Sequence, residues 1–185
     1  MSIINIRPLK TLDPADIRRL NSGYTSPAKY ALSKEETPVS TVIALKRVEL
    51  SQPYVKSWET GETDIALLQE ALQDNLSLAA YAGDRMVGIA IAEKRQWNRT
   101  LWVWEFHIDP AYHRQGIGRR LMQTLADLAR QQGLRVMVCE TQSTNVPAID
   151  FYRAVGFEVG GLDLSYYTND DLPDGEVAIF MKRKL

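Results

Sequence analysis

The sequence has few of the residues that build disulfide-linked or metal-dependent proteins. Its single cysteine, Cys139, excludes an internal disulfide framework and fits a reducing compartment. Because Cys139 lies in an apolar segment, we interpret it as a buried, inert thiol. The two histidines lie six positions apart and offer too few ligands for a structural zinc site. We therefore expect no metal.

An excess of one charge sign and a long apolar run are also missing. The formal net charge of −1 predicts neither a nucleic-acid partner nor binding to an anionic membrane surface. No segment approaches the roughly 18 apolar residues of a membrane span, and residues 1–5 do not resemble a signal peptide. The length of 185 residues, with 45% hydrophobic and 24% charged residues, is typical of a globular protein. We expect one domain over residues 1–185, located in the cytoplasm.

Hydrophobic periodicity predicts an α+β (mixed α/β) fold. Strands are expected at residues 3–9, 39–50, 76–82, 86–94, 101–108, 134–140, 157–167 and 176–181. Helices are expected to begin at Pro14, to span 63–72 with Thr63 as N-cap, to span 115–132, and to run from Asn145 to near Gly156. Residues 21–38 read as irregular or weakly helical, and residues 53–61 as a loop. The crossover rule makes segments 101–108 and 134–140 a parallel pair.

Two glycines, Gly116 and Gly118, stand where an apolar strand has ended and a long amphipathic helix begins. Glycines at a helix N-terminus let backbone N–H groups converge on an anion, and the helix dipole favours negative charge there. The loop also carries basic side chains, namely Arg114, Arg119 and Arg120. This combination predicts a pyrophosphate site.

One alternative is that this loop belongs to a dinucleotide-binding fold, because Glu140 lies roughly where such a fold has its ribose-binding acid. The third glycine position, however, holds Leu121. Seven residues, 109–115, separate the strand from the first glycine, whereas the dinucleotide turn is tight. The predicted βαβ unit also follows an antiparallel meander. The other alternative is a helix start whose glycines serve only the turn.

Residues 105–118 read Glu-Phe-His-Ile-Asp-Pro-Ala-Tyr-His-Arg-Gln-Gly-Ile-Gly, and residues 145–157 read Asn-Val-Pro-Ala-Ile-Asp-Phe-Tyr-Arg-Ala-Val-Gly-Phe. In this order and spacing, over roughly residues 76–183, the chain resembles the GNAT superfamily of acyl-CoA-dependent N-acyltransferases. The resemblance implies a GNAT fold, with a central, mostly antiparallel mixed sheet, a splayed parallel strand pair and flanking helices. It also implies acetyl-CoA as co-substrate and direct transfer in a ternary complex.

The resemblance also implies which residues hold the coenzyme. The backbone of Phe106, His107 and Ile108 would pair with the pantetheine amides, and Asn145 would contact the pantetheine arm. The phosphate loop would comprise His113, Arg114, Gln115, Gly116, Ile117, Gly118 and Arg119. His113 stands where the family usually has Gln or Arg. Tyr152 would protonate the leaving thiolate, and helical spacing places it on one face with Asn145.

The general base is a choice between two acids. Glu105 lies in an apolar strand, where alternation places it on one face with Val103 and His107. It could deprotonate the amine directly or through water, or it could lie on a solvated outer face. Glu140, at the end of the neighbouring strand, could act as base or bind the ammonium group.

Several short segments look like the streptothricin acetyltransferases, among them residues 97–99, 140–145, 161–163, 167–169 and 176–180. This narrower resemblance implies acetylation of the β-lysine amine of a small cationic antibiotic. Candidate substrate-binding residues are Trp58, Glu140, Asp163, Tyr167, Asp170 and Asp171. The alternatives are another small amine, a polyamine, a protein lysine or N-terminus, or a non-catalytic acyl-CoA sensor. The exposed edge of a half-open sheet leaves a homodimer open.

Overall fold

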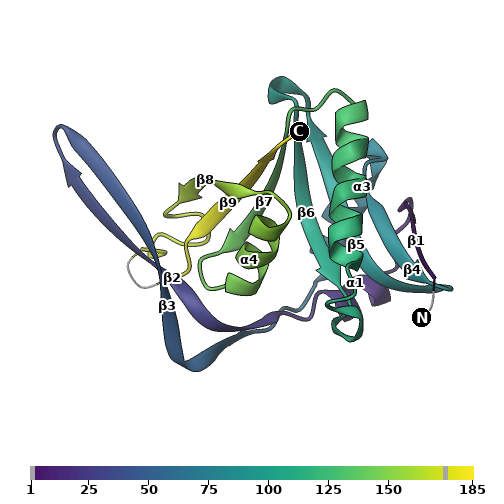
Figure 1. Cartoon of the computed structure of the whole chain (residues 1–185), viewed down its shortest axis with the longest axis horizontal. Helices are drawn as coiled ribbons and strands as arrows, with labels where there is room; N and C mark the ends of the chain where they lie inside the picture. Colours follow the sequence, from purple (N-terminus) through teal and green to yellow (C-terminus); the bar gives the residue numbers. More distant parts are fainter. Residues whose placement is uncertain (1–2, 173–174) are drawn as a thin grey trace. The chain divides into compact units, whose positions relative to one another are not determined.

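The computed structural model describes residues 3–172 and 175–185, and the chain packs as two compact units. Unit 1 comprises residues 1–22, 58–139 and 182–185, and unit 2 comprises residues 23–57 and 140–181. The elements of unit 1 are β1 (Ile4–Pro8), α1 (Pro14–Leu20), α2 (Glu62–Ala71), β4 (Leu78–Ala82), β5 (Arg85–Arg95), β6 (Thr100–Ile108) and α3 (Ile117–Gln131). Unit 2 contains β2 (Tyr24–Thr37), β3 (Ser40–Lys56), α4 (Val146–Ala154) and β8 (Glu158–Asp163). Strands β7 (Val136–Gln142) and β9 (Ala178–Lys184) have residues in both units (Figure 1). That residues 1–185 form one domain remains a prediction.

Seven strands hydrogen-bond in the order β1-β4-β5-β6-β7-β9-β8. The pairs β1–β4, β4–β5 and β5–β6 are antiparallel, whereas β6–β7 is parallel and joins Thr100–Val103 to Val136–Cys139. A mixed sheet that includes the parallel pair β6–β7 confirms the predicted α+β fold. Within residues 3–172 and 175–185, no helix combines the length and apolar character needed to cross a bilayer.

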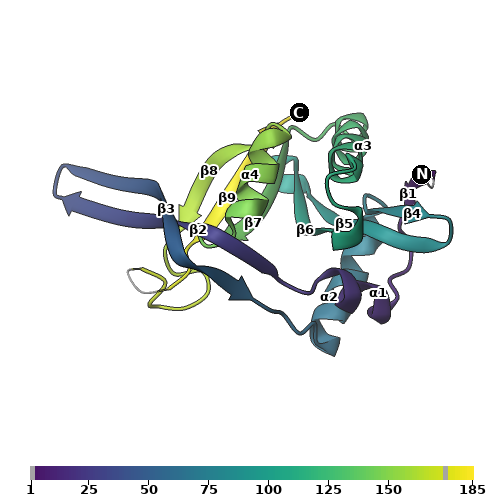
Figure 2. The same ribbon diagram turned by 60° about the horizontal axis from the view of Figure 1, so that its bottom comes forward.

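Helices cover both faces of the unit 1 strands (Figure 2). Apolar side chains of α1 and α2, such as Ile17 and Ile65, pack in one core cluster with Ile89 of β5. On the other face, Ile117 of α3 packs with Ala80 and Val87. β5 is consequently buried on both sides, which explains its nearly continuous apolar sequence.

The prediction that residues 21–38 are irregular or helical is wrong, because they form β2, paired with β3 in a long hairpin (Figure 1). Near its base β2 buries alternate residues, Ser26, Ala28 and Tyr30. Its outer half is exposed on both faces, so the alternation that marks a half-buried strand is absent from that part of the sequence. Pairing with a distant partner determines this strand.

Other predicted boundaries also shift. Residues 53–61 are not all loop, because β3 continues to Lys56 and includes Tyr54. Helix α2 has Gly61 as its N-cap in place of Thr63, and Asp64 Oδ2 accepts a hydrogen bond of 2.9 Å from Gly61 N–H. Strand β8 stops at Asp163, which leaves Tyr167 in the following loop.

Candidate functional site

Strand β6 brings two of the predicted residues into contact in unit 1. Glu105 Oε2 lies 2.5 Å from His107 Nε2, and both side chains are about one-fifth exposed. In the ladder with β5, Ile91 pairs with Glu105 and Ala92 with Val103, so Trp104 is an extra residue in β6. This bulge interrupts the alternation on which we placed Glu105 and Val103 on one face. The contact between the Glu105 and His107 side chains is unaffected, because both residues follow the bulge at Trp104.

The end of β6 is anchored by Asp109, which sequence reasoning treated only as a strand end. Its Oδ2 accepts hydrogen bonds from Arg85 at 2.8 Å and Arg19 at 3.0 Å, and its Oδ1 accepts from Ala111 N–H at 3.0 Å. Burial opposes ionisation, but these donors hold the pKa of Asp109 below its ordinary value. The carboxylate therefore fixes the point from which the glycine loop departs.

The loop between β6 and α3 has an unusual backbone. Arg114 and Gly116 have φ of +58° and +78°, in the left-handed region. A Cβ at Gly116 would meet nothing within 4 Å, so glycine serves the backbone conformation there and leaves the space beside it open. The His113 ring nitrogen Nε2 lies 2.8 Å from the Ile108 carbonyl oxygen, which ties the loop back to β6.

Gly116 is the N-cap of α3, and the first helical hydrogen bond runs from Arg120 N–H to the Gly116 carbonyl at 3.1 Å. The N–H groups of residues 117–119 precede that bond and therefore have no acceptor within the helix. A 15-residue helix adds its positive dipole end at the same place. Amides without an acceptor in the helix, the open space beside Gly116 and the positive end of the helix dipole together fit a phosphate group.

In unit 2, helix α4 carries Asn145 and Tyr152. Asn145 is the N-cap, and its Oδ1 accepts a hydrogen bond from Ala148 N–H at 3.3 Å. Tyr152 is buried, with 8% of its surface exposed, and its ring centroid lies 5.7 Å from that of Phe151 and 5.5 Å from that of Phe157. A buried ring is compatible with a proton donor and equally with a core aromatic residue whose hydroxyl reaches the surface, so the hydroxyl decides between these two interpretations.

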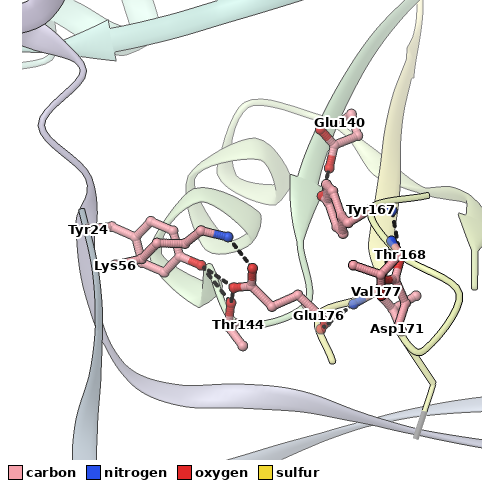
Figure 3. A network of polar contacts seen from close by, with 10 residues as sticks. Tyr24, Lys56, Glu140, Thr144, Tyr167, Thr168, Asp171, Glu176 and Val177 are labelled. Carbon is pink, nitrogen blue, oxygen red and sulfur yellow. Dashed lines mark hydrogen bonds and ion pairs between the residues drawn. The ribbon is translucent and has the colours of Figure 1, made fainter. Parts of the chain in front are cut away.

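A second contact in unit 2 joins Glu140 to Tyr167, whose hydroxyl donates a hydrogen bond to Glu140 Oε1 (Figure 3). Burial, reinforced by the Glu140 carboxylate, raises the pKa of Tyr167 above its ordinary value, so the hydroxyl stays protonated and remains a donor. The backbone before and after Tyr167 is held by Asp171, which accepts from Tyr167 N–H and Thr168 N–H, each at 2.8 Å. Asp171 is therefore a buried support for the loop.

A third group of contacts in unit 2 was missed by sequence reasoning. The Glu176 carboxylate accepts hydrogen bonds from Thr144 and from Tyr24, the latter at 3.1 Å, and forms an ion pair with Lys56 (Figure 3). Burial opposes ionisation of Glu176, but Lys56 and the two hydroxyls lower its pKa. Lys56 Nζ also lies 5.9 Å from the Tyr167 ring centroid. Glu176 lies in one of the segments that carry the narrower resemblance, which was the available signal.

The other residues predicted to bind the substrate lie in separate segments. Trp58 is half-buried in the segment between β3 and α2, in unit 1. Asp163 ends β8 and accepts a hydrogen bond from Ser165 N–H at 3.1 Å, so its carboxylate shapes the turn. Asp170 is exposed. Among the described residues, no group of three or more His, Cys, Asp or Glu side chains is arranged to hold a metal ion.

Comparison with known proteins identifies the family. The model of the acetyltransferase (GNAT) family matches residues 44–157. Streptothricin acetyltransferase of Streptomyces lavendulae is 28% identical over 183 residues, which cover 97% of this chain and 94% of the relative. The crystal structure of nourseothricin acetyltransferase superposes with a TM-score of 0.75 at 26% identity and covers 98% of both chains.

A Bacillus anthracis protein assigned as a streptothricin acetyltransferase, in complex with acetyl coenzyme A, superposes with a TM-score of 0.76 at 23% identity, over 100% of this chain and 98% of that one. At that identity the likeness concerns the fold. Together with the family match, it accounts for the mixed sheet, the glycine loop and the helix that follows. The chain belongs to the GNAT family and is an acetyl-CoA-dependent acetyltransferase.

Proposed function

We propose that this enzyme transfers an acetyl group from acetyl-CoA to a primary amine of a small cationic antibiotic of the streptothricin type, and so confers resistance. The observation that carries the proposal is the similarity to a streptothricin acetyltransferase along nearly the whole chain. The pair of Glu140 and Tyr167 supports it, because a carboxylate beside an aromatic ring suits an ammonium group.

Residues of the glycine loop and β6 in unit 1, and Asn145 in unit 2, are assigned to binding of the acetyl donor. The backbone N–H groups at the start of α3 and the side chains of Arg114 and Arg119 bind the pyrophosphate. The backbone of β6 at Phe106, His107 and Ile108 aligns the pantetheine arm, and His113 and Gln115 shape the loop. Asn145 contributes at the start of α4. Acetyl-CoA supplies the thioester that is attacked.

Transfer requires two proton movements. A lysine-like amine has a pKa of about 10.4 and arrives protonated at neutral pH. Glu105, paired with His107, accepts that proton directly or through water, which frees the nitrogen lone pair for attack on the thioester carbonyl carbon. The C–N bond forms, the C–S bond breaks, and the sulfur takes a proton from the Tyr152 hydroxyl. The attacking nitrogen loses its second proton, which returns through water to the Tyr152 oxygen, so the products are a neutral amide and the CoA thiol. No covalent acetyl-enzyme is needed.

The acceptor is recognised by Glu140 and Tyr167. Because the Tyr167 hydroxyl donates a hydrogen bond to Glu140 Oε1, the carboxylate is held in a defined position for contact with an ammonium group. The Glu140 carboxylate supplies the negative charge for the substrate, whereas the Glu176 carboxylate forms an ion pair with Lys56. Trp58 and Asp163 are further candidates for contacts with the antibiotic.

The test is release of free thiol from acetyl-CoA across a panel of amines. The panel contains streptothricin, a polyamine, free lysine, and peptides with a free N-terminus or an internal lysine. We expect kcat/KM for streptothricin to exceed all others. Strong activity on another amine without activity on streptothricin would overturn the substrate and leave the reaction class intact.

A further inference from the structure

The β2–β3 hairpin of unit 2 extends well beyond the elements against which its base packs. Two contacts hold its base in place. Tyr30 N–H donates a hydrogen bond of 2.8 Å to the Ser143 carbonyl oxygen, and Arg47 forms an ion pair with Asp150 at 3.0 Å. The outer part, residues 33–44, is exposed throughout (Figure 1). The strands pair only with each other within the part of the chain that the structure describes. A two-stranded ribbon is marginally stable in water without a further strand or a packed face.

The two outer edges of this hairpin differ in composition. The β2 edge carries Lys34, Glu35 and Glu36, the kind of charged residues that protect an edge from pairing with another chain. The β3 edge from Ser40 to Leu45 carries no charge and contains Thr41, Val42 and Ile43 in sequence. β-branched residues of this kind favour strands. Of the two edges, the composition of β3 alone therefore favours pairing with a strand of another chain.

Apolar exposure follows the same strand. Val39 in the turn is 93% exposed, Val42 is 55% exposed and Ile43 is 38% exposed. The register Thr37–Ser40 closes the hairpin with a two-residue turn, so that pair is hydrogen-bonded and the pairs alternate from there. By that alternation, the backbone groups of Thr41, Ile43 and Leu45 point outward from β3.

We propose that β3 is a dimerisation strand that pairs antiparallel with β3 of a second copy of this chain. A two-fold axis at Ile43 pairs Ile43 with itself and Thr41 with Leu45 of the partner, so all three outward-facing residues form ladder hydrogen bonds. The same axis forms a closed, isologous contact, whereas an arbitrary partner strand would need a matching neutral edge. The result is a four-stranded ribbon in the order β2-β3-β3-β2, with the charged β2 edges outermost.

The test combines charge substitution with sedimentation velocity at tens of micromolar protein. Ile43→Glu places two carboxylates opposite each other on the two-fold axis, where they repel. Within one hairpin the same substitution places the glutamate opposite Lys34, and this pair of opposite charges stabilises the hairpin of the monomer. We expect the wild type and the matched control Ile43→Val to sediment as dimers and Ile43→Glu as a monomer with an unchanged far-UV spectrum. A monomeric wild type, or a dimer that survives Ile43→Glu, would overturn the proposal.

Cysteine cross-linking checks the register. Cys139, the only cysteine, is 1% exposed and does not compete. A hydrogen-bonded antiparallel pair separates Cα atoms by about 5.5 Å, within disulfide reach. Ile43→Cys should therefore form a disulfide-linked dimer under mild oxidation, whereas Glu35→Cys on the β2 edge should not. Cross-linking of Glu35→Cys with none of Ile43→Cys would contradict the assignment of the edge.

Discussion

Glu105 and His107 lie two positions apart on β6, with the carboxylate oxygen 2.5 Å from the ring nitrogen Nε2. A carboxylate–imidazole contact of this kind fixes the orientation of both groups before any substrate is bound. Glu105 is thereby held at a definite position on a rigid strand, which a proton acceptor requires. The pairing also gives His107 a side-chain role that the resemblance alone did not imply.

Replacement of Glu105 by Gln should lower kcat by about 100-fold, because the amide keeps the shape of the side chain but cannot accept the proton. The loss should grow as pH falls, since less of the amine is then unprotonated. A pH–rate profile between pH 6 and 9 measures both effects. The control is Glu93→Gln on β5, whose carboxylate accepts a hydrogen bond from Trp104 at 2.8 Å. If the Glu105→Gln profile ran parallel to that of the wild type, Glu105 would not be the base.

Tyr152→Phe removes only the hydroxyl proposed to protonate the departing sulfur. We expect kcat to fall at least about tenfold while the Kd for acetyl-CoA stays the same. Steady-state kinetics and calorimetry with acetyl-CoA separate the two. Tyr30→Phe is the matched control, because it removes a hydroxyl that receives a hydrogen bond from Arg153 of α4. Turnover at the wild-type rate in Tyr152→Phe would remove this residue from the mechanism.

Glu140→Gln should raise KM for a cationic acceptor by about 10- to 100-fold and leave KM for acetyl-CoA unchanged. The reason is the loss of a charge-assisted contact, which contributes about 1.5–3 kcal/mol. Tyr167→Phe should have a smaller effect in the same direction, since it removes the hydroxyl that orients Glu140. An equal rise in KM for both substrates would show a general distortion and contradict acceptor binding by Glu140.

Asp109→Asn should lower the free energy of unfolding by about 2 kcal/mol at pH 7, because it leaves Arg19 and Arg85 without their common carboxylate. The pKa of Asp109 is lower in the folded than in the unfolded chain. Its stabilising contribution is therefore present above about pH 4 and is lost as pH falls further.

Urea denaturation at pH 7 and pH 3 measures this difference. The difference in the free energy of unfolding between Asp109→Asn and the wild type should be smaller at pH 3 than at pH 7. The control Asp84→Asn, at an exposed position, should have the same free energy of unfolding as the wild type at both pH values. If the difference in the free energy of unfolding between Asp109→Asn and the wild type were the same at pH 7 and pH 3, the ionised carboxylate of Asp109 would not stabilise the fold.

The sequence by itself determined the parts of this protein that depend on neighbouring residues. Pro14 behind an N-capping Asp13 predicts α1, and the glycine loop predicts the start of α3. An amphipathic helix between two apolar segments predicts the parallel β6–β7 pair, because a helix is the usual connection between neighbouring parallel strands. These features need only a few turns of chain to be specified.

Only the tertiary structure decided which distant polar side chains meet. Glu176 is joined to Lys56 by an ion pair across 120 positions, and Glu140 to Tyr167 across 27, separations that no local pattern encodes. The strand β2 likewise exists because β3 pairs with it, although its own residues are mixed and partly charged. Burial and hydrogen bonding between distant segments outweighed local propensity at each of these places.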